Sequence, residues 1–193
     1  MGTRNLTCVY KNGEYRVAQY GHRVAQYGQW DGYPEGQGVT ILEFLHRVNM
    51  DEFKTAIDNC RWITKEELDE INDGIDKGYI VNWQKRYLEL SRDTGGEILE
   101  VITFKNKRIL QNSLDFANNS LFCEWAYVVD LDQNTFEVYK GFNKEKLSET
   151  ERFYNVENNE KDYKPVKFLK SFDLSNLPTK DEFVAAFAEE NEE

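Results

Sequence analysis

The stretch from Gln29 to Gly38 gathers the residues of this chain that are best suited to holding a ligand. Its sequence, QWDGYPEGQG, places two large aromatic side chains, two carboxylates, one proline and three glycines within ten positions. Glycine opens backbone angles that other residues avoid, and Pro34 stiffens the turn between them. A loop of this kind is either a packing corner or a rigid platform for a ligand, and we favour the platform.

Each residue of this loop suggests a role. Trp30 and Tyr33 are suited to stacking on a flat or cationic group, and Asp31 and Glu35 to selecting its polar atoms. Residues 36–38 lead into an apolar helical pattern, where free N–H groups can bind an anion, although the two carboxylates would oppose one. The spacing matches neither the dinucleotide-binding fingerprint nor a P-loop. The predicted ligand-binding residues are Arg4, Gln29, Trp30, Asp31, Tyr33, Glu35, Gly36 and Gly38.

Arg4 joins this set because a guanidinium beside the start of a strand is a good anchor for a carboxylate or phosphate. Metal sites are not expected. Asp130, Asp132 and Asn134 have the spacing of the first ligands of a calcium loop, but its sixth and twelfth positions lack the required glycine and glutamate, so we predict a hairpin turn. Two histidines and no Cys-x-x-Cys leave nothing from which to build a zinc site. We expect no cofactor.

Two alternatives to a binding protein stay open, so the sequence leaves undecided whether the chain is an enzyme. An early strand, a hairpin, helices and further antiparallel strands follow the coarse order of N-terminal-nucleophile amidohydrolases. In that hypothesis Thr3, once exposed by cleavage, or Cys8 would attack the substrate. In the third hypothesis the glycine-rich loop serves only packing or oligomerisation.

The composition limits the classes of partner. A net charge of −11 and a pI near 4.8 disfavour general binding to nucleic acid or to anionic membranes. No apolar run approaches the roughly 20 residues of a membrane helix, and the N-terminus lacks an apolar signal core. Three widely spaced cysteines fit reduced, buried thiols. We therefore expect a cytoplasmic protein with one globular domain over residues 1–188 and a disordered acidic tail over 189–193; its oligomeric state is left open.

The hydrophobic pattern predicts an α+β fold. We expect a mainly antiparallel sheet built from an N-terminal hairpin and C-terminal strands, with a helical middle section and a C-terminal helix. Capping boxes mark helix starts at Thr64 and Thr179. The expected strands cover residues 6–10, 15 onward, 122–130, 135–142 and 166–172. The expected helices cover residues 39–48, 50–60, 65–71, 83–90, 97–104, 109–116 and 180–187.

A tandem duplication interrupts the N-terminal hairpin. Residues 15–21 (YRVAQYG) and 22–28 (HRVAQYG) are identical at six of seven positions. Strand side chains alternate with a period of two, so a repeat of seven would point equivalent residues to opposite faces of the sheet. We therefore predict a bulge or loop near Gly21, with one copy paired in the sheet and the other displaced.

The N-terminal residues MGTR, taken together with the loop QWDGYPEGQG, resemble a group of uncharacterised proteins of tailed phages and bacteria. These proteins begin similarly and carry the pattern [HQ]WDGYPxGxG, and the resemblance covers about the first 45 residues. Gln29 stands where many members have histidine, and the duplication is a second departure. The group has no established activity. From the resemblance and the loop together we expect a protein that binds a small molecule or a host protein in phage–host conflict.

Overall fold

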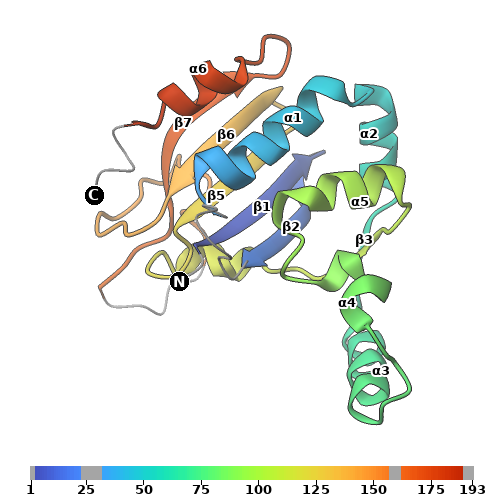
Figure 1. The fold of residues 1–193 in the computed structure, drawn as a ribbon. Coiled ribbons are helices and arrows are strands. Elements are labelled where there is room, and N and C mark those ends of the chain that lie inside the picture. Colours follow the sequence, from blue (N-terminus) through green and yellow to red (C-terminus); the bar gives the residue numbers. More distant parts are fainter. Residues whose placement is uncertain (1–2, 23–31, 157–161, 189–193) are drawn as a thin grey trace.

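A five-stranded sheet with the order β2-β1-β5-β6-β7 forms the centre of the computed structural model, which describes residues 3–22, 32–156 and 162–188 (Figure 1). Only the pair β1–β5 is parallel, so the fold is the mainly antiparallel α+β architecture that the sequence predicts. The five strands are β1 (Arg4–Lys11), β2 (Glu14–His22), β5 (Trp125–Asp130), β6 (Thr135–Lys140) and β7 (Lys167–Asp173).

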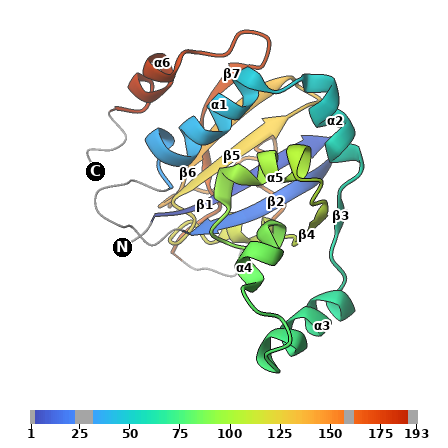
Figure 2. The same cartoon turned by 45° about the vertical axis from the view of Figure 1, so that its right-hand side comes forward.

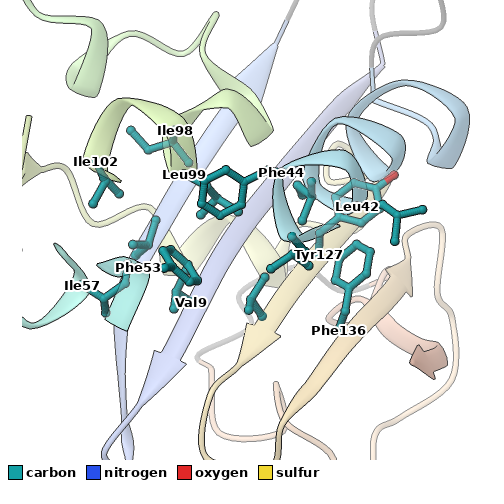
Figure 3. Packing of buried hydrophobic residues seen from close by; sticks show 14 of the residues in the cluster. Val9, Leu42, Phe44, Phe53, Ile57, Ile98, Leu99, Ile102, Tyr127 and Phe136 are labelled. Carbon is teal, nitrogen blue, oxygen red and sulfur yellow. The ribbon is translucent and has the colours of Figure 1, made fainter. Parts of the chain in front are cut away.

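Helices cover one side of this sheet, which we call the helix face (Figures 1 and 2). They are α1 (Val39–Arg47), α2 (Met50–Asp58), α5 (Ile98–Phe104) and α6 (Lys180–Ala185). Their apolar stripes meet alternate residues of the strands in a continuous core, seen in Figure 3. Fully buried members of this core include Val9, Leu42, Phe44, Phe53, Ile57, Ile98, Leu99, Ile102, Tyr127 and Phe136.

Irregular segments cover the opposite side, which we call the loop face. Leu6 and Cys8 of β1 and Ala126 and Val128 of β5 point to this side. They pack against apolar residues of the segments 111–124 and 141–166. The sheet therefore has two buried faces, and the strand β5 is buried at all six positions. Cys8, Cys60 and Cys123 are free and buried, as predicted.

The predicted helix starts are confirmed. Thr64 and Thr179 each accept a hydrogen bond from the backbone N–H three residues on, and the glutamate carboxylate at that position accepts one from the backbone N–H of the threonine. A π-helical turn, Pro34–Gly38, leads directly into α1. Asn49 caps α2: its side-chain oxygen accepts hydrogen bonds from the backbone N–H groups of Asp51 and Glu52, each at 3.0 Å.

Three of the predicted helices are wrong in extent or type. The helix α3 (Lys65–Asp76) runs past Ile71 and through Gly74. The absence of a side chain at Gly74 lets Ile80 pack closely on this helix, since a Cβ at Gly74 would lie 2.7 Å from Ile80 Cδ1. The residues 109–116 contain no α-helix. Instead β4 (Ile109–Leu110) pairs in parallel with β3 (Arg61–Trp62), which satisfies the backbone of both segments, and a 3-10 turn, Leu114–Asn118, follows.

The segment predicted as a helix over residues 83–90 is broken into α4 (Trp83–Arg86) and a 3-10 turn, Leu88–Leu90. Together with β3 and β4 it connects the body of the molecule to α3, which extends away from the sheet (Figures 1 and 2). Across the described residues no helix is long and apolar enough to cross a membrane.

The first copy of the duplication lies wholly within β2. Gly21 pairs in regular register with Asn5, so no bulge falls at Gly21 itself. The predicted alternative, a loop after this position, would fall outside the described residues. The bulge lies at Arg16 instead: Val9 pairs with Val17 but Tyr10 pairs with Tyr15. Residues 23–28 of the second copy lie outside the described part of the chain, as do residues 189–193 of the predicted tail.

Candidate functional site

The predicted loop packs closely on the sheet where the structure describes it; Gln29, Trp30 and Asp31 lie outside the described residues. Tyr33 is half-buried against the helix-face core, with its ring centroid 6.2 Å from that of Trp125. The N–H groups of Gly36 and Gly38 both donate to the carbonyl of Tyr33, at 3.0 and 3.4 Å. These two predicted anion donors therefore already have a partner within the loop.

The glycines of the loop permit close contact with neighbouring elements. A Cβ at Gly38 would lie 2.8 Å from Cε1 of Phe183, and one at Gly32 would lie 2.6 Å from the Thr3 carbonyl oxygen. The Tyr127 hydroxyl donates to the Gly32 carbonyl at 2.9 Å. These contacts fasten the loop to α6 and to the strands β1 and β5.

Gln37 was missing from the predicted set, although it holds the loop in place. It is buried, and its Oε1 atom accepts a hydrogen bond of 2.6 Å from the backbone N–H of Gly96. A Cβ at Gly95 would lie 2.5 Å from the same oxygen, and Gly95 has a φ of +50°. The pair of glycines at 95–96 is thus required for Gln37 to reach the backbone before α5.

The remaining predicted residues lie at the edge of this loop. The Arg4 guanidinium carbon lies 4.7 Å from the centre of the Phe122 ring, a cation–π contact. Glu35 is half-buried, and its charge adds to the effect of burial in raising the pKa of Tyr127. The structure thus brings Tyr33, Glu35, Gly36 and Gly38 together, while the Arg4 side chain is engaged with Phe122. Their role in binding stays a prediction.

A hollow lies on the loop face, and none of the predicted residues lines it. Its volume is about 770 Å³, within the range of small-molecule sites. Strands β1, β2, β5, β6 and β7 and the segment 141–166 all contribute to its wall. The lining residues are Tyr10, Tyr15, Asp130, Gln133, Glu137, Tyr139, Thr150, Glu151, Arg152, Lys167 and Phe168.

A bulge in β2 supplies one wall of this hollow. Val17 points to the helix face, so regular alternation would send Tyr15 to the same side. The extra residue, Arg16, reverses the alternation and turns Tyr15 to the loop face beside Tyr10. The two rings meet edge to face, with centroids 5.1 Å apart.

A second bulge, in β7 at the opposite edge of the sheet, acts in the same way. Phe172 packs on the helix face, and regular alternation would put Phe168 there too. Val138 pairs with Lys170 but Tyr139 pairs with Phe168, so Leu169 is the extra residue and Phe168 turns to the loop face. Its ring meets that of Tyr139 at 5.6 Å. Both edge strands thus break their regular pattern to line one hollow.

Arg152 forms the floor of the hollow between two buried carboxylates. Its Nε and Nη2 atoms donate to the two oxygens of Glu137, at 2.8 and 2.9 Å, and Nη2 also donates to Asp130. The guanidinium lies over the ring of Tyr10, 4.9 Å from its centre. The Tyr139 hydroxyl donates to Glu137 at 2.6 Å. The cluster therefore ties the segment 141–166 to β1, β5 and β6.

Near neutral pH, Arg152 stays charged and Tyr15 and Tyr139 stay neutral. Burial alone would lower the pKa of Arg152, but its hydrogen bonds to Glu137 and Asp130 outweigh burial and raise the pKa, so the guanidinium stays charged. Burial raises the pKa values of Tyr15 and Tyr139, which therefore stay neutral. The Arg152 guanidinium lies between the side chains of Asp130 and Glu137, with which it forms ion pairs.

The Tyr15 hydroxyl lies near Arg152, whose charge acts to lower its pKa against the larger effect of burial, yet its geometry forms no hydrogen bond. It is buried and has no hydrogen-bond partner among the described residues. The Tyr15 ring is held in place by stacking on Phe153, at 6.2 Å and 14°, as well as by Tyr10. A buried hydroxyl without a partner costs free energy, and a bound group that reaches it would remove that cost.

The calcium-like segment is the hairpin turn that we predicted. Asp130 accepts hydrogen bonds from the N–H groups of Asp132 and Gln133 at 2.9 and 2.8 Å, in addition to Arg152. Asp132 accepts from the N–H groups of Asn12 and Gly13 in the neighbouring hairpin. No group of three or more potential ligands is arranged to hold a metal ion within residues 3–22, 32–156 and 162–188.

The two nucleophiles of the enzyme hypothesis do not line the hollow. Cys8 is fully buried between the sheet and the loop-face core, and burial raises the pKa of its thiol, which disfavours the reactive thiolate. Thr3 is buried where the loop at Gly32 crosses it. Neither side chain is placed to meet a substrate in the hollow.

No family model, curated protein or solved structure significantly matches this chain. The resemblance of its first residues to uncharacterised phage and bacterial proteins stays a prediction, and the function has to be inferred from the site itself.

Proposed function

We propose that this protein binds a small organic molecule in the hollow around Arg152. The observation that carries the proposal is the pair of bulges at Arg16 and Leu169, which turn Tyr15 and Phe168 toward the same hollow from opposite edges of the sheet. Bulges often redirect a side chain next to a binding site. Each bulge shifts the register of an antiparallel strand pair, β1–β2 or β6–β7, that is regular on either side of it.

The buried ion cluster also supports a binding role. Removing Arg152, Asp130 and Glu137 from water has a large desolvation cost, and apolar residues of similar size often stabilise a fold at least as well. A cluster that adds little net stability is more readily explained by what it positions. Here it fixes the orientation of Tyr10 and Tyr139 in the wall.

The wall and floor favour a flat molecule that is uncharged or positively charged. Four aromatic rings line the hollow, and such rings bind flat apolar groups and cations. Three acidic residues (Asp130, Glu137 and Glu151) and two basic ones (Arg152 and Lys167) line the hollow, a formal sum of 2 − 3 = −1 that opposes an anion. The Tyr15 hydroxyl offers one hydrogen bond to a polar atom of the ligand.

The proposal can be tested by soaking crystals of the full chain with tyramine, tryptamine, nicotinamide and adenosine, and with benzoate as an anionic comparison. We expect at least one of the first four to lie against Tyr15 or Phe168, and calorimetry to give it a Kd lower than that of benzoate. Tyr15→Phe, which removes only the unpaired hydroxyl, should weaken a ligand that hydrogen-bonds there by about 5–10-fold, as the loss of one hydrogen bond predicts.

Phe168→Ala should weaken the same ligand by roughly tenfold through lost ring contact. Phe142→Ala is the matched control. Phe142 follows the end of β6 and is exposed to a similar extent as Phe168, but it does not line the hollow. An empty hollow in every soaked crystal, or ligands whose Kd is the same in all three variants, would contradict the proposal.

A further inference from the structure

The helix α3 and the turn that follows it, residues 65–82, form an arm that the other described residues do not cover. Figures 1 and 2 show α3 extending from the body beyond α4. No residue of α3 is buried, in contrast to α1, α2 and α5. The arm therefore contributes little to the core, and its surface is open to a partner.

Acidic residues form a stripe along α3. The helix contains six carboxylates and one lysine, and four of the carboxylates recur at helical spacing on one side. These four are Glu66, Asp69, Asp73 and Asp76, and all are exposed. The opposite side carries Leu68, Ile71 and Ile75, which are only half-buried.

The turn after α3 presents two apolar side chains in a fixed conformation. Tyr79 is 79% exposed and Val81 is 71% exposed, the highest values among the large hydrophobic residues that the structure describes. The N–H groups of Tyr79 and Ile80 both donate to the Gly74 carbonyl at 2.9 Å. Gly78 and Asn82, with φ values of +74° and +53°, bound this turn. The turn is thus held in shape without a partner, which lowers the entropic cost of binding.

We propose that this arm docks on another protein whose surface is basic and surrounds an apolar cleft. Tyr79 and Val81 would enter the cleft, since an exposed aromatic residue on a rigid turn is the usual anchor of an interface. The acidic stripe of α3 would face the basic rim and speed association. This surface is distinct from the hollow around Arg152.

The same charges disfavour the other occupants. A nucleic acid would bring phosphates against the acidic stripe. A second copy of this chain would bring a net charge of −11 against the arm of the first. A basic protein is therefore the partner whose chemistry the arm fits.

For the test, the photocrosslinker p-benzoylphenylalanine replaces residue 81 of the full chain, and residue 142 in a control protein. Each protein is then irradiated in a lysate of the source organism. A protein that is crosslinked from position 81 but not from 142 is then purified and titrated with the unmodified full chain. We expect its crosslinked peptide to come from a lysine- and arginine-rich surface, and its Kd to rise by tenfold or more with Tyr79→Ala.

Raising the salt concentration from 50 to 500 mM should weaken this complex, and the triple variant Glu66→Lys, Asp69→Lys, Asp73→Lys should weaken it further at low salt. Tyr79 and Val81 are so exposed that their alanine variants should keep the circular dichroism spectrum and the melting temperature. No specific crosslink, a crosslink to a second copy or to nucleic acid, or a partner that binds Tyr79→Ala with unchanged Kd would overturn the proposal.

Discussion

The two faces of the central sheet are both buried, but they are stabilised by different kinds of contact. The helix face is closed by apolar stripes of four helices against Val9, Tyr127 and Phe136. The loop face combines a smaller apolar core with the charged cluster of Arg152, Asp130 and Glu137. Apolar packing needs only complementary shape, whereas a buried charge needs every hydrogen bond to be made.

This difference separates a supporting face from a face suited to binding. On the helix face the apolar residues of the strands pack directly against the apolar stripes of the helices. On the loop face two bulges and an unpaired Tyr15 hydroxyl depart from the regular pattern at the place where the hollow lies. Such departures are expected where function, rather than stability, decides the local structure.

The largest effect should come from breaking the loop-face cluster. Arg152→Met leaves two buried carboxylates without their partner, so we expect the free energy of unfolding to fall by about 3–5 kcal/mol in urea denaturation. The triple variant Asp130→Asn, Glu137→Met, Arg152→Met removes the unpaired charges as well and should recover most of this loss. If the triple variant were no more stable than Arg152→Met, the cluster would not be behaving as a buried ion set.

A cavity on the helix face should cost somewhat less and should not be recoverable by changing charges. Leu42 is a fully buried residue of α1. Leu42→Ala should lower the free energy of unfolding by roughly 2–5 kcal/mol through lost burial and the cavity that remains. Leu42→Met, which conserves volume, is the control and should cost less than about 1.5 kcal/mol. Equal losses in both variants would indicate that this face is not closely packed.

The smallest effect concerns the pH dependence of the contact between two hairpin turns, in which Asp132 of the β5–β6 turn accepts hydrogen bonds from the β1–β2 turn. Hydrogen bonds from the backbone N–H groups of Gly13 and Asn12 lower the pKa of Asp132 below its ordinary value of 3.8. A carboxyl whose pKa is lowered by folding stabilises the fold above pH 3.8 and loses that effect as the pH falls through the lowered value. Melting temperatures between pH 2 and 6 should therefore fall less steeply for Asp132→Asn than for the unchanged chain; parallel curves would contradict this assignment.

Much of the fold was predictable because its signals are local. The Asn12-Gly13 turn adopts positive φ at both residues, as a tight hairpin requires, and the two capping boxes start helices at the predicted residues. The prediction over residues 109–116 failed because Ile109 and Leu110 are drawn into a ladder with Arg61 and Trp62, nearly fifty positions earlier. Local propensity cannot anticipate such a pairing.

The candidate site was less predictable for the same reason. The loop at 29–38 attracts attention because its aromatic and acidic residues are adjacent in sequence, whereas the hollow draws Tyr10, Tyr15, Glu137, Arg152 and Phe168 from five separate segments. The one usable signal was the pair of tyrosines that flank the first turn. Nothing marks Arg152 within its charged segment.

The sequence by itself determined the α+β class, the N-terminal hairpin and the two capped helix starts, because hydrophobic period, glycine and capping residues act over a few positions. Only the tertiary structure decided where the two bulges fall and which charged side chains form ion pairs. Those outcomes depend on register and on partners distant in sequence, since a shift of one residue in a strand exchanges its two faces.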